Sequence, residues 1–308
     1  MRRKNVKKIT IVGSMNMDIV VETPRLPVAG ETISGRSVAE IPGGKGANQA
    51  YAVGKLGGDV SMIGGVGNDA YGLALKNNLE SVGVNTNGVQ VMPDVPTGQA
   101  HITVDDSGEN SIVLIAGANG MVTKELVDRN IGLIERCDIL IMQLEIPLET
   151  VLYVKDLAVK LGKTVIVDPA PALSDIPDDF WQGIDYIKPN ETELQILVGR
   201  KLETLDDLKQ GAREMLNKGV KHILVSLGSE GCLFVSSEQE EFFPANKVRA
   251  VDTTAAGDSF TAAFALALSW GKAVDEAIAF GQKVSAVVVT CKGAQTSIPS
   301  MEELNGPQ

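Results

Sequence analysis

Short apolar runs alternate along this chain with longer segments in which apolar residues recur at helical spacing. The short runs are rich in β-branched residues and have the length of buried strands: residues 9–13, 60–63, 139–142, 164–167, 186–187 and 223–226. The helical segments are residues 47–56, 71–81, 124–135, 148–161, 205–217, 259–270 and 274–289. This alternation predicts an α/β fold in three layers, Rossmann-like, with a mostly parallel sheet that helices cover on both faces.

Two stretches depart from this alternation. Residues 18–22 and 31–41 follow the first strand with no helix between them. Residues 97–104 and 110–116 form a second pair, joined by the turn sequence Asp105-Asp106-Ser107-Gly108. We expect a small separate sheet, inserted at about residues 18–41 and 97–116. No proline-rich or serine-rich linker interrupts the chain, so residues 1–308 are predicted to form one domain.

The composition narrows the class of protein. An apolar fraction of 44% and a charged fraction of 22% are those of a globular protein, and no apolar run approaches the ~20 residues of a membrane span. The net charge of −11 argues against a nucleic-acid partner. The three cysteines lie far apart without C-x-x-C spacing, which fits buried thiols in a reducing compartment better than a zinc site. We expect a cytoplasmic protein that binds neither nucleic acid nor membrane.

The first residues carry several basic side chains, among them Arg2 and Arg3, and superficially resemble the start of a signal peptide. The apolar stretch that follows, residues 9–13, is too short for the hydrophobic core of such a peptide and leads to Asp18. We therefore expect no export and interpret the basic residues as a frayed leader.

A carboxylate and a predicted helix N-terminus come together in the segment Ala250-Val251-Asp252-Thr253-Thr254-Ala255-Ala256-Gly257-Asp258-Ser259-Phe260. A helix that begins near Ala256 would present free backbone N–H groups and the positive end of its dipole, which suits a phosphate. Asp258 could then be the base that phosphoryl transfer to a hydroxyl requires. Equally, Asp252 could be an N-cap and Asp258 an ordinary first-turn acid. The two histidines, His101 and His222, are interpreted as structural, which favours carboxylates for proton transfer.

A glycine-rich segment precedes the helical pattern at 47–56: Pro42-Gly43-Gly44-Lys45-Gly46-Ala47-Asn48-Gln49-Ala50. Its glycines permit close approaches that a β-carbon would block. Together with Gly13-Ser14-Met15-Asn16-Met17-Asp18 and the segment around Asp258, it resembles the ribokinase family of carbohydrate kinases, from about residue 9 to residue 297. Further matching pieces lie in the family's order at residues 142–145, 168–171, 188–193, 226–231 and 292–295. Many relatives have asparagine at the position of Asp168.

The resemblance implies a kinase that uses ATP and Mg²⁺. The implied reaction is phosphorylation of D-ribose at its 5-hydroxyl, giving ribose 5-phosphate and ADP; fructose, deoxyribose or a nucleoside are the alternative acceptors within the family. Asp258 would remove the hydroxyl proton, and the N–H groups of Ala255, Ala256 and Gly257 would hold the developing charge. The small sheet would form a lid over the sugar and the contact of a homodimer.

The resemblance also assigns ligand contacts. The sugar contacts are Asn16, Asp18, Gly44, Lys45, Asn48, Glu145 and Asp258. The nucleotide contacts are Asn190, Ser226, Leu227, Gly228, Ser229, Glu230, Gly231, Gly257 and Gln282, the last standing where close relatives often carry a histidine. From the residues alone, Lys45 could be a solvated loop lysine and Glu145 a helix-capping acid.

Two metal sites follow from the same resemblance. Asn190 and Glu193 would organise Mg²⁺ through water, an assignment compatible with a capping interaction at a helix start. A K⁺ ion would be held by Asp252, Ser297 and the backbone carbonyls of Thr254, Val288, Cys291 and Gly293. Thr254 and Cys291 differ from the residues frequent in the family, but a carbonyl ligand tolerates a changed side chain.

Other classes of protein are less well supported. The segment Gly65-Val66-Gly67-Asn68-Asp69-Ala70 matches a dinucleotide fingerprint, as a nicotinamide-dependent dehydrogenase would require. Such an enzyme also needs an acid ~20 residues further on to hold the ribose hydroxyl, and Asn85 lies near that place. Tight packing at a strand–helix turn is the favoured interpretation. A non-catalytic sugar-binding protein would give Asp258 no reason to share a turn with an anion site.

Overall fold

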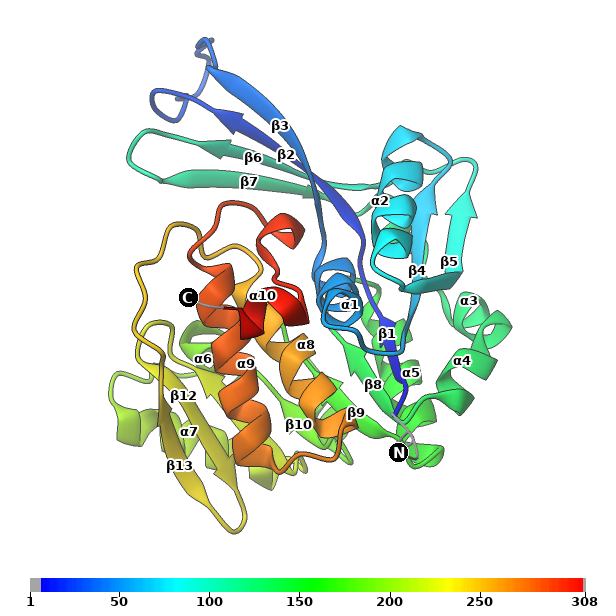
Figure 1. Ribbon diagram of the computed structural model, residues 1–308, viewed down its shortest axis with the longest axis vertical. Helices are drawn as coiled ribbons and strands as arrows, with labels where there is room; N and C mark the ends of the chain where they lie inside the picture. The colour runs from blue at the N-terminus through cyan, green and yellow to red at the C-terminus, as the bar shows by residue number, and fades with distance from the viewer. Residues whose placement is uncertain (1–6, 307–308) are drawn as a thin grey trace.

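The computed structural model describes residues 7–306, in which nine strands form the larger of two sheets (Figure 1). Their order is β13-β12-β11-β10-β9-β8-β1-β4-β5. The bounds are β1 Ile9–Val12, β4 Val60–Gly67, β5 Asn85–Met92, β8 Ile139–Met142, β9 Thr164–Val167, β10 Tyr186–Ile187, β11 His222–Ser226, β12 Gly231–Ser236 and β13 Glu240–Pro244. All pairs from β11 to β5 are parallel, and β12 and β13 add antiparallel pairs at one edge. The predicted mostly parallel sheet is confirmed. Residues 1–6 of the predicted leader lie outside the described range.

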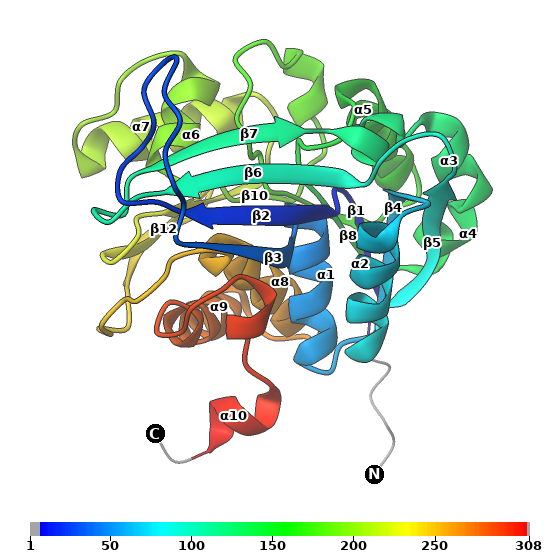
Figure 2. The ribbon, with the colours of Figure 1, turned by 90° about the horizontal axis from the view of Figure 1, so that it is seen from above.

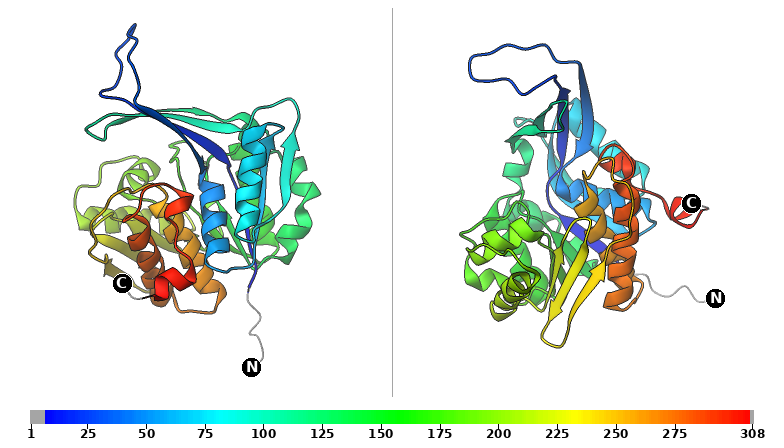
Figure 3. Two further views of the ribbon diagram at one scale, coloured as in Figure 1. Left: turned by 45° about the horizontal axis from the view of Figure 1, so that its top comes forward. Right: turned by 90° about the vertical axis from the view of Figure 1, so that its left-hand side faces the viewer.

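Helices cover both faces of this sheet, as the views of Figures 1 and 3 show. On one face lie α1 Lys45–Lys55, α2 Ala70–Ser81, α8 Ala256–Ser269 and α9 Val274–Val288, and on the other α3 Lys124–Arg129, α4 Ile131–Arg136, α5 Leu148–Lys160, α6 Glu191–Val198 and α7 Leu205–Asn217. Successive residues of a strand point to opposite faces of the sheet and pack into a separate hydrophobic core on each. Ile139 and Ile141 of β8 face the first group of helices, and Leu140 and Met142 face the second. A short helix, α10 Met301–Asn305, ends the described chain. None of the described helices is long and apolar enough to cross a membrane.

A second sheet of four strands forms from the two predicted insertions. Its order is β3-β2-β6-β7, with β2 Asn16–Glu22, β3 Ser37–Gly43, β6 Gly98–Val104 and β7 Asn110–Ile115. Figures 1 and 2 show this sheet above the edge of the main sheet where the parallel strands end. Ligands of open α/β sheets bind at that edge, so the second sheet stands over the expected ligand position.

Several predicted boundaries were wrong, each for a local reason. The strand predicted at residues 31–41 begins only at Ser37, because Glu31 accepts the N–H of Val28 at 3.1 Å and pairs with Arg25 in a loop that projects from the second sheet (Figure 3). The helix predicted at 124–135 is two helices. Asn130 breaks it, with φ of −112° and ψ of 12°, and its Nδ2 donates to Leu126 O at 2.9 Å. Strands β5, β12 and β13 were not predicted.

Candidate active site

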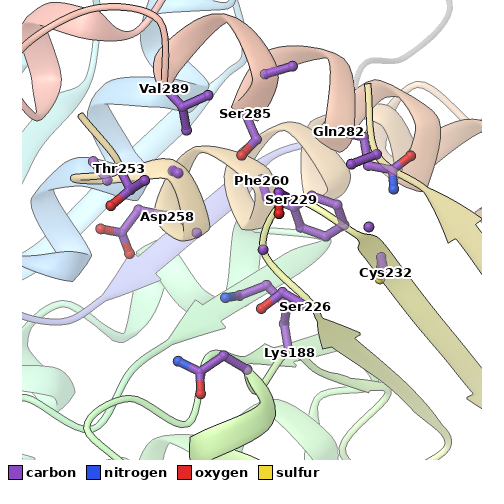
Figure 4. Close-up of a pocket in the computed structure, with 18 of the residues that line it drawn as sticks. Lys188, Ser226, Ser229, Cys232, Thr253, Asp258, Phe260, Gln282, Ser285 and Val289 are labelled. Carbon is purple, nitrogen blue, oxygen red and sulfur yellow. The ribbon is translucent and has the colours of Figure 1, made fainter. Parts of the chain in front are cut away.

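Asp258 lies in the first turn of α8, at the wall of a large cavity (Figure 4). The helix begins at Ala256 because the preceding residue, Ala255, takes a left-handed backbone with φ of 60°. Asp258 is only 7% exposed, and Ala255, Ala256 and Gly257 line the same cavity. The predicted base and the predicted anion site are therefore brought together. The Ala256 N–H, one of the predicted anion donors, donates to Thr253 O at 3.2 Å in this structure.

Two side-chain amides from α1 hold the Asp258 carboxylate. Asn48 Nδ2 donates to Oδ2 at 2.9 Å, and Gln49 Nε2 donates to Oδ1 at 3.1 Å. Each amide is fixed in turn, because Gln295 Nε2 donates to Asn48 Oδ1 at 3.0 Å and Gln143 Nε2 donates to Gln49 Oε1 at 2.6 Å. Both carboxylate oxygens are thus oriented by donors that cannot turn without breaking a second hydrogen bond.

A buried ion pair lies beside the base. Asp168 directly follows β9 and Lys188 directly follows β10; Lys188 Nζ stands 3.6 Å from Asp168 Oδ2, with side chains 6% and 4% exposed. Burial raises the pKa of Asp168; the charge of Lys188 opposes this shift, and the Asp258 carboxylate adds to it. A β-carbon on Gly257 would lie 3.2 Å from Lys188 Nζ, so this cation borders the anion site. Neither member of the pair had been assigned a role from the sequence.

The predicted sugar residues gather around the start of α1. Asn16 and Asp18 lie on β2, next to β3 and the glycines that lead into α1. Asp18 Oδ1 is buried and has no hydrogen-bond partner within the described residues. Asn119 was not predicted: its Nδ2 donates to Asn16 Oδ1 at 2.7 Å, and its Oδ1 accepts the Met15 N–H at 2.9 Å. The Asn16 oxygen thus accepts one hydrogen bond, and its amide nitrogen donates to no group among the described residues.

Glu145 fixes the start of α1. Its Oε2 accepts the Lys45 backbone N–H at 3.0 Å and the Ser14 hydroxyl at 2.5 Å. Gly44 stands at the N-cap position with φ of 86°, which favours glycine, and provides no side chain to cap the helix. Glu145 therefore caps a helix, which was the alternative to a sugar contact. The helix that it caps is α1, not α5, which follows Glu145 in the sequence. Its other oxygen takes no part in the cap.

Electrostatic coupling links the sugar residues to the base. Burial raises the pKa of Asp18 to about 7, with the charges of Glu145 and Asp258 adding to the effect and that of Lys45 opposing it. Burial alone would lower the pKa of Lys45, but the carboxylates of Asp258 and Glu145 outweigh it and raise that pKa above its usual value. Lys45 is therefore a cation surrounded by acids, and it is the first residue of α1 rather than a loop lysine.

The cavity has a volume of about 830 Å³, within the range of small-molecule sites. Of the predicted nucleotide contacts it is lined by Asn190, Ser226, Gly228, Ser229, Gly231, Gly257 and Gln282. Leu227 and Glu230 do not line it: Leu227 packs in the core, and the Glu230 N–H closes a turn onto Leu227 O at 3.0 Å. Phe260, Ser285 and Val289, which had not been predicted, complete one wall (Figure 4). Lys45 and Asp258, both predicted sugar contacts, also line it.

The predicted Mg²⁺ residues form a complete capping box at the start of α6. Glu193 N–H donates to Asn190 Oδ1 at 2.8 Å, and Glu193 Oε2 accepts the Asn190 N–H at 2.8 Å. Both residues also line the cavity. Across the described range, no three Asp, Glu, His or Cys side chains are arranged to hold a metal directly. One free Glu193 oxygen in the cavity fits a contact through water.

The predicted K⁺ residues come from two segments that the structure joins. Asp252 Oδ2 accepts the Gly293 N–H at 2.9 Å, and Oδ1 accepts the Thr254 N–H at 2.9 Å. Burial alone would raise the pKa of Asp252, but these hydrogen bonds outweigh it and lower that pKa. Two predicted ligands have partners inside the late segment: Val288 O accepts the Cys291 N–H at 3.1 Å, and the Ser297 hydroxyl donates to Ala294 O at 2.7 Å. The structure thus joins the Asp252 loop to the late segment, with both Asp252 oxygens accepting backbone N–H groups, and the K⁺ site stays a prediction.

The dinucleotide-like segment does not form a phosphate loop. Strand β4 continues to Gly67, and a β-carbon at Gly65 would stand 2.9 Å from Ala118 O. At the start of α2, Asp69 Oδ1 accepts the Gly72 N–H at 2.8 Å and the Thr97 hydroxyl at 2.6 Å. A carboxylate thus occupies the helix N-terminus where a pyrophosphate would bind, and close packing explains the glycines.

Comparison with known proteins places this fold and site in a family. Residues 6–301 match the model of the pfkB family of carbohydrate kinases. The chain is 41% identical to the ribokinase of Schizosaccharomyces pombe, over 97% of this chain and 96% of that protein. It is 38% identical to the deoxyribokinase of Salmonella typhi, over 96% of this chain and 97% of that protein. The structure of Arabidopsis thaliana ribokinase complexed with ribose and ATP is similar with a TM-score of 0.91 and 35% identity, covering 97% of each chain.

The chain therefore belongs to the pfkB family of carbohydrate kinases. It is a phosphotransferase that acts on a sugar hydroxyl. The prediction of a kinase, in preference to a dehydrogenase or a non-catalytic binding protein, is confirmed.

Proposed function

We propose that the protein transfers the γ-phosphoryl group of ATP to the 5-hydroxyl of D-ribose, giving ribose 5-phosphate and ADP. The observation that carries this proposal is the position of Asp258, a buried carboxylate between the cavity of about 830 Å³ and the predicted sugar residues. Two similar proteins support the choice of substrates: the Schizosaccharomyces pombe relative is a ribokinase, and the Arabidopsis thaliana ribokinase structure contains ribose and ATP.

In the proposed reaction Asp258 accepts the proton of the 5-hydroxyl as its oxygen attacks the γ-phosphorus in line. The bond between that phosphorus and the bridging oxygen of ADP breaks as the new one forms. The N–H groups of Ala255, Ala256 and Gly257 receive the charge that develops on the phosphoryl oxygens. The two amides on Asp258 orient its carboxylate before the sugar arrives.

The sugar is held by groups of opposite hydrogen-bonding character. Asp18 offers a buried acceptor that lacks a donor among the described residues, and Asn16 offers amide N–H groups, its oxygen already accepting from Asn119. Such a pair suits neighbouring hydroxyls, one donating and one accepting. Lys45 and Glu145 complete the polar wall. Burying these groups without the sugar is costly, which supports a polyhydroxyl ligand.

Two cations belong to the proposal. Mg²⁺, when bound, neutralises phosphate charge, and Asn190 and Glu193 would hold it through water. The Asp252 loop would hold K⁺ together with residues 288–297, which would fix the backbone that leads into Ala255. Both sites remain proposals that the side-chain chemistry fits.

We propose a homodimer that forms through the second sheet, which would also act as a lid over the sugar. Four consecutive residues of β7, Ile112, Val113, Leu114 and Ile115, are 51%, 60%, 59% and 41% exposed. An apolar strand of this kind at a sheet edge is a template for pairing with another chain. The three free cysteines support a reducing, cytoplasmic location.

The test of the proposed function is an ADP-release assay across D-ribose, 2-deoxy-D-ribose, D-fructose and a set of nucleosides. We expect the highest kcat/KM with D-ribose, and phosphate on the 5-hydroxyl of the product by nuclear magnetic resonance. Because a deoxyribokinase is 38% identical over nearly the whole chain, deoxyribose is the decisive comparison. If kcat/KM is higher with deoxyribose, deoxyribose is the proposed substrate in place of ribose, and the proposed phosphoryl transfer by way of Asp258 is unchanged.

A further inference from the structure

Gln49 is fully buried at the point where two acidic side chains meet. Its Nε2 donates to Asp258 Oδ1 at 3.1 Å and to Asp168 Oδ2 at 3.0 Å. Its Oε1 accepts from Gln143 Nε2 at 2.6 Å, and none of its surface is exposed. A primary amide has two N–H donors, and here each is directed at a different carboxylate.

We propose that Gln49 is a positioning residue for phosphoryl transfer, which holds the Asp258 carboxylate in orientation and links it to that of Asp168 through a shared amide donor. The inference rests on the proposed function, in which Asp258 is the base. Asn48 fixes only Oδ2 of Asp258, so Gln49 alone among the described donors fixes Oδ1 through a side-chain amide.

The surrounding charges explain why a neutral amide serves at this position. The groups coupled to Asp258 are Lys45 on α1, Asp18 on β2 and Asp168 after β9, and Lys188 pairs with Asp168 at 3.6 Å. The two lysines already supply positive charge. An amide adds a donor to each of two anions without attracting either into a salt bridge, which would draw Asp258 away from a sugar hydroxyl.

A double-mutant cycle separates this role from a structural one. Gln49→Met keeps the length of the side chain and removes its donors. We expect kcat to fall about tenfold or more, the value of a hydrogen bond to a charged group, while the dissociation constants of ribose and ATP stay within about threefold. In an Asp258→Asn background the same substitution should cost less than about twofold, because the group it positions is gone.

Thr10→Val is the matched control. Thr10 is 1% exposed, and its hydroxyl donates to Leu133 O at 3.1 Å, away from the base. Thr10→Val shows the effect of losing one buried hydrogen bond away from the site, and we expect its kcat to equal that of wild type. If Gln49→Met does not fold, Gln49→Leu takes its place in the cycle, since it also removes both donors and adds no charge beside Asp258 and Asp168.

The outcomes are distinguishable. No ADP release by the wild-type protein with any of the sugars would reject the proposed function. Full turnover by Asp258→Asn would instead reject the proposed base, and with it this inference, while the proposed function would stand. If Asp258→Asn is inactivated but the Gln49 substitution lowers kcat by the same factor in both backgrounds, Gln49 does not act through Asp258 and the positioning role is wrong. A loss confined to the background that contains Asp258 supports it.

Discussion

The backbone of Gly43 lies against the carboxylate of Asp18, so that a β-carbon at residue 43 would stand 2.8 Å from Asp18 Oδ1. Glycine leaves the space into which this acid turns from β2. We expect Gly43→Ala to displace the carboxylate and to raise the KM for the sugar about tenfold, with little change in the KM for ATP. Steady-state kinetics check this expectation. Gly306→Ala is the control, since its β-carbon would come no nearer than 3.4 Å to Glu302 O. An unchanged sugar KM would remove Asp18 from the sugar site.

We expect the Asp18 carboxylate to lower the free energy of unfolding while it contributes to sugar binding. Its pKa is raised from 3.8 to about 7, first by burial and then by Glu145 and Asp258. The folded protein therefore binds this proton more tightly than the unfolded chain, and the free energy of unfolding falls as the pH rises from about 4 to about 7. We expect Asp18→Asn to have a higher Tm than wild type at about pH 8, with the difference shrinking toward about pH 4, while the sugar KM increases.

Thermal unfolding of both proteins across this pH range, without ligand, is the measurement. A Tm for Asp18→Asn that is below wild type at every pH would show that the carboxylate is not under the electrostatic cost that we infer.

The K⁺ proposal predicts activation that depends on Asp252. We expect K⁺ to raise kcat well above its value in buffer with only large organic cations, and Asp252→Ala to abolish the response because the site loses its one anion. Asp105→Ala is a close control: Asp105 accepts the Ser107 N–H at 2.8 Å and hydroxyl at 2.6 Å, as Asp252 does from Thr254 at 2.9 and 2.6 Å. Equal rates with and without K⁺, in protein freed of bound cation, would reject the site and leave the kinase assignment intact.

The exposed apolar strand predicts a dimer that one charge can break. Leu114 is 59% exposed on β7, so Leu114→Glu should place a charge within the proposed contact and yield monomers. Val91→Glu, at a residue 45% exposed on the edge strand β5, should leave the oligomeric state unchanged. Light scattering coupled to size-exclusion chromatography gives both masses. A wild-type monomer at micromolar concentration would contradict the proposed contact.

The sequence predicted most of the main sheet because its parallel strands are continuous apolar runs between amphipathic helices. Strand β5 escaped prediction because its sequence contains two asparagines and a glycine, residues depleted in strands, and it forms only because β4 offers a parallel partner. The edge strand β13 has no buried residue in its sequence Glu240-Glu241-Phe242-Phe243-Pro244, so it lacks the pattern of a core strand. Its partner β12 is apolar and buried, and could have been predicted.

Part of the site could have been predicted from the residues that directly follow the parallel strands. Gln143, Asp168 and Lys188 directly follow β8, β9 and β10, and the ends of adjacent parallel strands must lie together. Their convergence near Asp258 could therefore have been predicted. The roles of Gln49 and Asn119 could not, because the direction of an amide depends on partners distant in the chain: 209 residues separate Gln49 from Asp258, and 103 separate Asn119 from Asn16.

The central claim is that Asp258 is the base of phosphoryl transfer, and the turnover of Asp258→Asn tests it most directly. Asparagine keeps the shape of the side chain and an acceptor for one amide, so the protein should fold and bind both substrates within a few-fold of wild type. Asp275→Asn, an exposed acid in the first turn of the neighbouring helix α9, is the control and should keep full activity. We predict that kcat of Asp258→Asn falls by about 10²–10⁴, the usual contribution of a positioned general base. Near wild-type kcat in folded Asp258→Asn protein would contradict the mechanism.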